Sequence, residues 1–281
     1  MLKLESALLD MSLHEPGDGF YMGTRFDGAG IFDSLRFKDI EMCGRWFTRY
    51  DPLMHDAVCG PAEEFSPVFL PDGILKIGVG LLQGDGAPYD RFKLYPVLDA
   101  GVRFKEADAN SVTFRHCLEG FYDYSKEIAV TGPASFRISH TIRAEMPLDT
   151  EAYNHNFFTF GKISVSPGRR LEFPFAPAGN WRAEYDSVGF TPSGILFSRD
   201  IKEGESVYSG DIHRSGHDGL PYTFTLREGG LAVHVSADVP STHMVFWANH
   251  RIACPEPYNR VHAAPGETVR WTIFYRIEDE T

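Results

Sequence analysis

The chain has 281 residues, of which 43% are hydrophobic and 14% aromatic, with 27 glycines and 18 prolines. This is a globular, turn-rich composition that excludes a disordered chain, and its length suits one all-β domain with a sizeable core. The net charge of −12 argues against nucleic acid and anionic membrane as partners and fits a neutral substrate better than a phosphorylated one, although a local basic pocket could still bind an anion.

Alternation of apolar and polar residues with period two recurs along the chain and predicts short β-strands. It is clearest over residues 136–143, 222–227 and 271–278. Glycine and proline turn signals separate such runs, at residues 71–73, 84–86, 166–168, 229–230 and 265–267. No long stretch has a helical period with caps, and no linker or repeat divides the chain. We therefore expect one all-β domain over residues 1–281, a single antiparallel β-sandwich with the last strand, Val269–Ile277, in its core.

The cysteines and histidines do not predict a metal site. The four cysteines are scattered, without a Cys-x-x-Cys pair, so reduced core residues are expected. His213 and His217 have an i, i+4 spacing, but the glycines around them argue against a helix that would align them. The N-terminus has no apolar segment followed by a cleavage site, and no apolar run approaches the roughly 18 residues of a membrane span. A cytoplasmic location is the default expectation, although a trimmed signal peptide would leave the same sequence.

Residues 153–158, Tyr-Asn-His-Asn-Phe-Phe, place an imidazole among amides and aromatic rings. The asparagines on either side of His155 can orient its ring, and the aromatic neighbours can exclude water and perturb its pKa. The alternative is a strand edge in which His155 is a satisfied polar side chain without a chemical role.

Residues 254–258, Cys-Pro-Glu-Pro-Tyr, hold Glu256 between two prolines that stiffen the backbone. A histidine and a glutamate that face one pocket can donate one proton and accept another at neutral pH. Aromatic walls suit a sugar ring, because its C–H faces are apolar. The alternative is a stiff loop that carries a solvated glutamate.

The order of these two segments resembles the aldose 1-epimerases, the galactose mutarotase-like proteins. Their motif Asn-His-x-Tyr/Phe-Phe-Asn-Leu is similar to residues 154–160, although Thr159 and Phe160 replace the final Asn-Leu. Their Cys-x-Glu-Pro/Thr segment is similar to residues 254–257, and the turn and closing strand after it are similar to residues 265–267 and 269–277. The resemblance implies the galactose mutarotase-like supersandwich, with His155 as the acid at the ring oxygen and Glu256 as the base.

The N-terminal region also resembles a divergent branch of this family, over residues 23–27, 31–35, His55-Asp56 and 60–65. One departure concerns the substrate contacts. The family's Gly-Arg-x-x-Asn-Arg and His-Gly-Gly segments supply an arginine and a second histidine, and neither has a counterpart here.

Several residues are candidates to replace the missing contacts. Glu63 and Glu64 can accept hydrogen bonds from sugar hydroxyls, or they form a solvated acidic turn. Arg25 and Lys76 can restore the cation, or they belong to structural ion pairs.

Other candidates rest on chain order and residue type. Asn154 flanks the histidine of the motif. Asp211 lies in the interval where the family has an aspartate that binds a sugar hydroxyl, with His213 as its competitor. Three tryptophans can stack on a sugar, and Trp181 is favoured over Trp46 and Trp247 because it follows a loop-like stretch.

The resulting hypothesis is an aldose 1-epimerase acting on a neutral sugar, with Glu256 and His155 on opposite sides of one bound pyranose. Both steps are proton transfers, so no cofactor is implied, and the partner is a small carbohydrate. A non-catalytic carbohydrate-binding protein is the main alternative, which the missing arginine and histidine favour. A lyase or hydrolase that pairs Glu63 with Glu256 is a third. The identity of the sugar, the pathway and the oligomeric state stay open.

Overall fold

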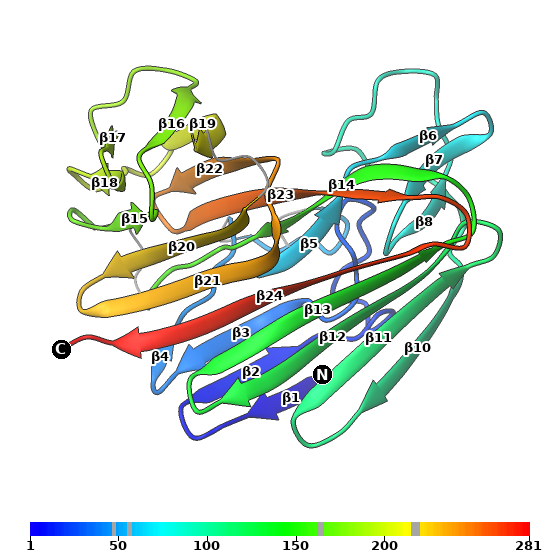
Figure 1. Ribbon diagram of the computed structural model, residues 1–281, viewed down its shortest axis with the longest axis horizontal. Coiled ribbons are helices and arrows are strands. Elements are labelled where there is room, and N and C mark those ends of the chain that lie inside the picture. Colours follow the sequence, from blue (N-terminus) through cyan, green and yellow to red (C-terminus); the bar gives the residue numbers. More distant parts are fainter. Residues whose placement is uncertain (47–48, 55–57, 162–165, 215–219) are drawn as a thin grey trace.

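The structure of the chain is a computed structural model that describes residues 1–46, 49–54, 58–161, 166–214 and 220–281. These residues contain no helix, and their paired strands run antiparallel (Figure 1). The all-β expectation is confirmed. It follows that the described residues include no helix long and apolar enough to cross a membrane.

Two large sheets form the sandwich. The ten-stranded sheet has the order β10 (Val102–Ala107), β11 (Ser111–Leu118), β12 (Tyr122–Gly132), β13 (Ser135–Ala144), β24 (Thr268–Asp279), β21 (Leu231–Pro240), β20 (Pro221–Glu228), β15 (Arg170–Glu172), β18 (Gly194–Phe197) and β17 (Val188–Thr191). The six-stranded sheet has the order β16 (Pro177–Trp181), β19 (Ser206–Arg214), β22 (His243–Asn249), β23 (Ala253–Ala263), β14 (Leu148–His155) and β5 (Ala62–Phe65).

Two smaller sheets accompany the sandwich. One has the order β1 (Leu2–Glu5), β2 (Leu9–Leu13), β3 (Phe32–Phe37) and β4 (Ile40–Glu41). The other has the order β6 (Val68–Leu70), β7 (Gly73–Lys76), β8 (Gly80–Leu82) and β9 (Val97–Asp99). In Figure 1 the second small sheet forms one of two upper projections, and β16 to β19 form the other.

The closing strand, β24, shows how the alternation of apolar and polar residues determines which side chains enter the core. Its buried residues take every second position, namely Trp271, Ile273, Tyr275 and Ile277, each 1% exposed. Burying a large apolar side chain contributes about 1.5–3 kcal/mol. The strand lies between β13 and β21 in the ten-stranded sheet, as expected for a strand integral to the core.

Contacts between the two large sheets define the interior. The ring of Phe65 on β5 meets the edge of Trp271 on β24, with ring centroids 6.2 Å apart. The hydroxyl of Tyr275, also on β24, donates to Asn156 Oδ1 at 3.0 Å. Asn156 in turn donates to the carbonyl of Pro255 at 2.9 Å. This chain of contacts ties both candidate segments of the sequence to the core.

Candidate active site

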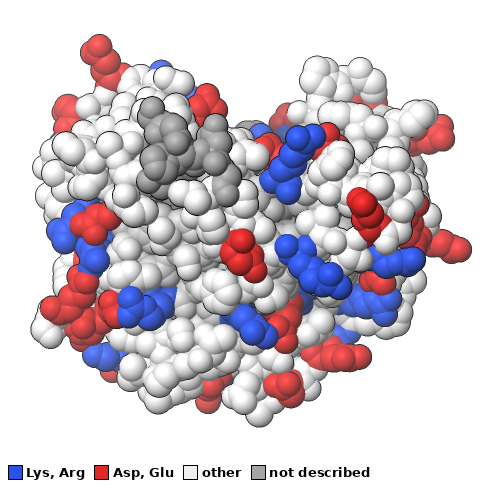
Figure 2. Space-filling view, viewed as in Figure 1, with Lys and Arg blue, Asp and Glu red and all other residues white. Residues whose placement is uncertain are grey.

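A cleft of about 290 Å³ lies against the six-stranded sheet. Three of its lining residues come from that sheet, Tyr208, Trp247 and Glu256, and the others come from loops, namely Arg25, Trp46, Arg91, Phe92 and Arg182. The surface is hollowed between the two upper projections, with basic side chains and some acidic ones at the hollow (Figure 2). Hollows of about 380 and 560 Å³ lie elsewhere on the described surface, but neither contains His155 or Glu256.

Strand register brings His155 and Glu256 together from positions about a hundred residues apart. Tyr153 on β14 pairs with Tyr258 on β23, and the same antiparallel register continued by two residues sets His155 opposite Glu256. Their side chains touch, with 3.0 Å between His155 Nδ1 and Glu256 Oε1. The structure thus joins the two predicted catalytic residues at the cleft, where Glu256 forms part of the wall and His155, 1% exposed, lies behind it.

The other ring nitrogen of His155 contacts Glu64. The distance from Nε2 to Glu64 Oε2 is 3.0 Å. Burial alone would raise the pKa of Glu64, but the charges of Arg25 and Lys76 outweigh it and hold that pKa well below its usual range. An ionised carboxylate only accepts hydrogen bonds, so Nε2 carries the proton in this contact.

With the proton on Nε2, the contact between Nδ1 and Glu256 depends on a second proton. At 3.0 Å a bare Nδ1 and an ionised Glu256 would repel each other, so the contact is favourable only when one of the two groups holds a proton. The contact is not directional, because Nδ1 has no hydrogen-bond partner among the described residues. Nδ1 is therefore a buried nitrogen whose hydrogen-bonding capacity no described residue uses.

Arg25 anchors Glu64 from the side of the cleft. Its Nε donates to Glu64 Oε2 at 2.7 Å, and both residues are buried. The guanidinium lies 5.3 Å from the ring of Trp46 and 5.2 Å from that of Phe92. The backbone next to Arg25 is held by an isolated antiparallel β-bridge between Phe26 and Glu64 of β5. Arg25, predicted as a substrate contact, thus lines the cleft and also forms a structural ion pair.

Lys76 lies deeper than Arg25. It is fully buried at the end of β7, where its Nζ donates to the carbonyl of Phe65 and lies 3.6 Å from Glu64 Oε1. Burial lowers the pKa of Lys76 to about 8. Lys76 is not part of the cleft wall. Its contact with Glu64 is therefore a structural ion pair, the alternative to a substrate contact.

Glu63 and Asn154 lie on the other face of the six-stranded sheet. They are paired in register, and Asn154 Nδ2 donates to Glu63 Oε2 at 2.7 Å. Both are buried, Glu63 Oε2 lies 3.5 Å from His140 Nε2 of the ten-stranded sheet, and neither residue lines the cleft. Burial raises the pKa of Glu63 to about 8. This geometry does not support a Glu63–Glu256 pair of the kind a lyase or hydrolase would need.

Gly60 fixes the backbone of the histidine. A Cβ at this position would lie 2.1 Å from the carbonyl oxygen of His155 and 2.7 Å from the nitrogen of Phe157. Any side chain at position 60 would therefore displace the segment that carries the imidazole. The glycine is required by close approach of two backbones.

Comparison with known proteins rests on structure. No protein-family model matches the sequence, and no curated protein sequence matches it significantly. The GalM/aldose epimerase homologue from C. elegans superposes with a TM-score of 0.57 at 13% identity, covering 100% of this chain and 99% of that one. A galactose mutarotase-like protein from Clostridium acetobutylicum gives 0.55 at 12%, covering 99% and 94%.

A third match, galactose 1-epimerase from Lactobacillus acidophilus NCFM, has a TM-score of 0.54 at 8% identity and covers 99% of this chain and 94% of that one. The chain has the galactose mutarotase-like fold. The expected fold is confirmed, and the low identities fit a divergent branch. At such identities the match establishes the mutarotase-like architecture alone.

Two predicted substrate contacts of this mutarotase-like chain lie away from the cleft. Trp181 is half-buried at the end of β16, where it packs on Tyr185 and Phe190 with ring centroids 5.7 and 4.9 Å away. Asp211 is exposed in a bulge of β19, and its carbonyl contacts His213 Nδ1 at 2.6 Å. Neither lines the cleft. His55, Asp56 and His217 lie outside the described residues.

The sequence reasoning missed several residues of the cleft. Arg91 and Phe92 come from the loop between β8 and β9, and Arg182 directly follows β16. Trp46 and Trp247, second choices to Trp181, stack on each other with centroids 4.8 Å apart. No motif marks these positions in the sequence.

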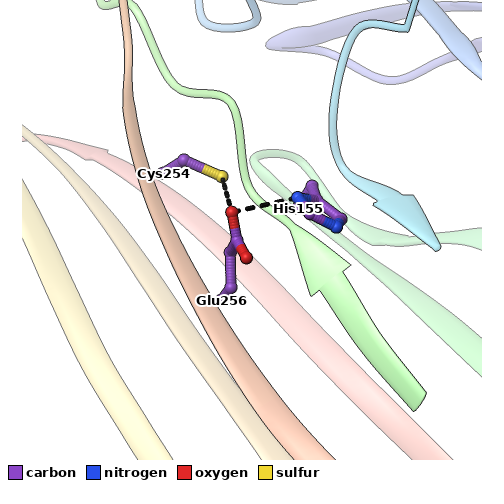
Figure 3. A group of neighbouring side chains, drawn as sticks. All are labelled: His155, Cys254 and Glu256. Atoms are coloured by element: carbon purple, nitrogen blue, oxygen red, sulfur yellow. Dashed lines mark hydrogen bonds and ion pairs between the residues drawn. The ribbon is translucent and has the colours of Figure 1, made fainter. Parts of the chain in front are cut away.

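His155, Cys254 and Glu256 place one ligand atom each within 4.8 Å of one another, a set that could hold a metal ion. One oxygen of Glu256 contacts both partners, with Cys254 Sγ at 3.4 Å (Figure 3). Burial raises the pKa of the Cys254 thiol well above its usual range, which disfavours the thiolate that metals bind. The hydrogen bond from this thiol to Glu256 is the simpler account of the arrangement.

Proposed function

We propose that this protein is an aldose 1-epimerase-like enzyme that interconverts the anomers of a sugar. The observation that carries the proposal is the contact of 3.0 Å between His155 Nδ1 and Glu256 Oε1 at the wall of an aromatic cleft. The mutarotase-like fold supports it, because galactose 1-epimerase from Lactobacillus acidophilus shares the fold.

The geometry revises how the pair would meet the sugar. Groups in direct contact leave no room for a pyranose between them, so an arrangement on opposite sides does not fit this structure. The anomeric oxygen and the ring oxygen are both bonded to C1, however, and lie close together at one edge of the ring. Two adjacent groups can therefore serve both oxygens from one side.

The proton transfers are set by this placement. Glu256 accepts the proton of the anomeric hydroxyl while Nδ1 of His155 donates a proton to the ring oxygen, and the bond from C1 to the ring oxygen breaks. After rotation about C1–C2 the open-chain hydroxyl attacks the other face of the aldehyde. It returns its proton to Nδ1, and Glu256 returns its proton to the new anomeric oxygen. Each positioned proton transfer contributes roughly 10²–10⁴-fold.

The buried partners support this role of His155. Its Nε2 is held by Glu64, which Arg25 anchors in turn. A carboxylate at one nitrogen orients the ring and fixes which nitrogen faces the substrate. We expect Glu64 to act as a positioning residue that does not touch the sugar.

Saturation-transfer NMR on a broad panel of sugars tests the proposal, with wild type and Glu256→Gln compared against buffer. Wild type should accelerate anomer exchange, and Glu256→Gln should lose about 10²–10⁴-fold of the acceleration. An exchange rate no faster than buffer for every sugar would refute it.

A non-catalytic carbohydrate-binding protein is the second candidate. It is favoured by the position of His155, which Glu256 separates from the cleft in this structure. Calorimetry run beside the exchange assay separates the two, because binding without exchange identifies a binding protein. A cytoplasmic location stays a prediction from the sequence.

A further inference from the structure

The cleft is basic although the protein is acidic. The chain carries 39 acidic and 27 basic residues, yet among the residues that the structure describes three arginines and a single carboxylate line the cleft. Charge of one sign in a concave, partly apolar site focuses the field and raises the local concentration of ligands of the opposite sign. The local balance is thus opposite to that of the whole molecule.

Two of the three arginines form no ion pair with a carboxylate in the described part of the chain. Arg25 is paired with Glu64, but no ion pair joins Arg91 or Arg182 to a carboxylate of the residues that the structure describes. Arg182 lies over the ring of Tyr208, 4.1 Å from its centroid. Arg91 lies near Tyr258, and the charge of Glu64 also acts on it from beyond ion-pair distance. Neither guanidinium is held in an ion pair by a described carboxylate, so both keep hydrogen-bond donors for a ligand.

The two arginines reach the cleft from different walls. Arg91 comes from the loop between β8 and β9, and Arg182 from the segment after β16. The stacked pair of Trp46 and Trp247 supplies an apolar surface in the same cleft. Guanidinium groups match phosphate and carboxylate oxygens with paired hydrogen bonds. Indole faces match the C–H face of a sugar ring.

We propose that the ligand of this cleft is a sugar that carries an anionic group, a phosphate monoester or a carboxylate, held by Arg91 and Arg182. The inference rests on the proposed function, because Glu256 remains the group that faces the anomeric carbon. It replaces the neutral sugar that the net charge of the chain favours, since the local charge of the site and not the global charge selects the ligand.

Calorimetry with four sugars and one ion tests the inference: glucose 6-phosphate, glucuronate, glucose, galactose and inorganic phosphate. At least one anionic sugar should bind wild type ten times or more as tightly as either neutral sugar, and its affinity should fall as salt is raised. The two anionic sugars distinguish phosphate from carboxylate. Equal affinity for charged and neutral sugars, no binding of either anionic sugar, or inorganic phosphate binding as tightly as glucose 6-phosphate would each overturn the inference.

Arg182→Gln and Arg91→Gln provide the second measurement. Each should weaken the anionic sugar about 10- to 100-fold, the range expected for one hydrogen-bonded charge, and leave glucose and galactose nearly unchanged. Arg143→Gln is the matched control, because Arg143 is exposed on β13 away from the cleft. Circular dichroism checks that each variant folds.

The exchange assay distinguishes failure of the anionic-ligand inference from failure of the proposed function. Exchange of neutral sugars without preference for anionic ones removes the inference and keeps the proposed function. Tight binding of an anionic sugar without exchange keeps the inference and removes the proposed function. Absence of both removes both.

Discussion

Glu63 and Glu64 are neighbours on β5, yet their side chains lie on opposite faces of the six-stranded sheet. Glu64 meets Arg25 and His155 beside the cleft, whereas Glu63 meets Asn154 on the inner face. Since side chains of a strand alternate, the same dipeptide places one carboxylate against Arg25 and Lys76 and the other beyond ion-pair distance of its nearest lysine, Lys126. Burial raises the pKa of Glu63 to about 8. Glu64 is equally buried, but the charges of Arg25 and Lys76 outweigh this effect and hold its pKa well below its usual range.

Replacing each glutamate by glutamine should separate these two environments. Glu64→Gln removes one partner of a buried ion pair and leaves Arg25 uncompensated, so we expect a loss of about 3–5 kcal/mol in the free energy of unfolding. Glu63→Gln resembles the protonated acid that Glu63 is at neutral pH, so its loss should stay below about 1 kcal/mol. Urea unfolding of both variants at pH 7 measures the difference. Equal losses would contradict the assigned protonation states.

The raised pKa of Glu63, about 8 against an ordinary value of 4.5, predicts a pH dependence of stability. Between these pH values the folded state holds a proton that the unfolded state releases, so the free energy of unfolding falls as pH rises. The contribution is fully present below about pH 4.5 and lost as pH rises through about 8. The slope is at most about 1.4 kcal/mol per pH unit.

Glu63→Gln isolates this effect, because glutamine does not titrate. Between pH 5 and pH 8 the unfolding free energy of wild type should fall relative to that of Glu63→Gln. Urea unfolding at each pH measures it, and a difference that is constant or moves the other way would show that Glu63 is ionised in the folded protein.

The contact of Cys254 with Glu256 allows a test of metal dependence. If the thiol only donates a hydrogen bond, exhaustive treatment with EDTA should leave anomer exchange unchanged, and Cys254→Ser should retain it within a few fold. A metal held by His155, Cys254 and Glu256 would instead make exchange sensitive to the chelator. Readdition of Zn²⁺ after EDTA serves as the control.

Two tryptophans should respond in opposite ways to replacement. Trp247→Ala removes a cleft surface that stacks on Trp46, so we expect about tenfold weaker sugar binding, equal to about 1.4 kcal/mol. Trp181→Ala should leave affinity unchanged and lower the unfolding free energy by about 2 kcal/mol, less than the roughly 3–5 of a fully buried aromatic side chain. Calorimetry and urea unfolding of both variants give the comparison. Weaker sugar binding by Trp181→Ala would show that Trp181 does contact the sugar.

Sequence periodicity could predict the layers, and two motifs could predict the pair at the centre of the site. The burial pattern of β24 is already visible in the alternation of Trp271, Ile273, Tyr275 and Ile277. The choice between Glu63 and Glu64 was out of reach, because it depends on the phase of a strand of four residues, Ala62–Phe65, which carries no periodic signal of its own. Arg91 and Arg182 were missed for another reason. They come from separate loops, and only the folded sheet sets those loops on facing walls.

The arrangement of β5 beside β14 has a consequence for biosynthesis. The carboxylate of Glu64 and the imidazole that contacts it are 91 residues apart in the chain, and a further stretch of similar length precedes Glu256. A polypeptide emerging from the ribosome thus carries Arg25, Glu63 and Glu64 long before β14 exists to enclose them. These charges have to stay hydrated during translation, so the N-terminal quarter cannot reach its final packing until most of the protein has been made.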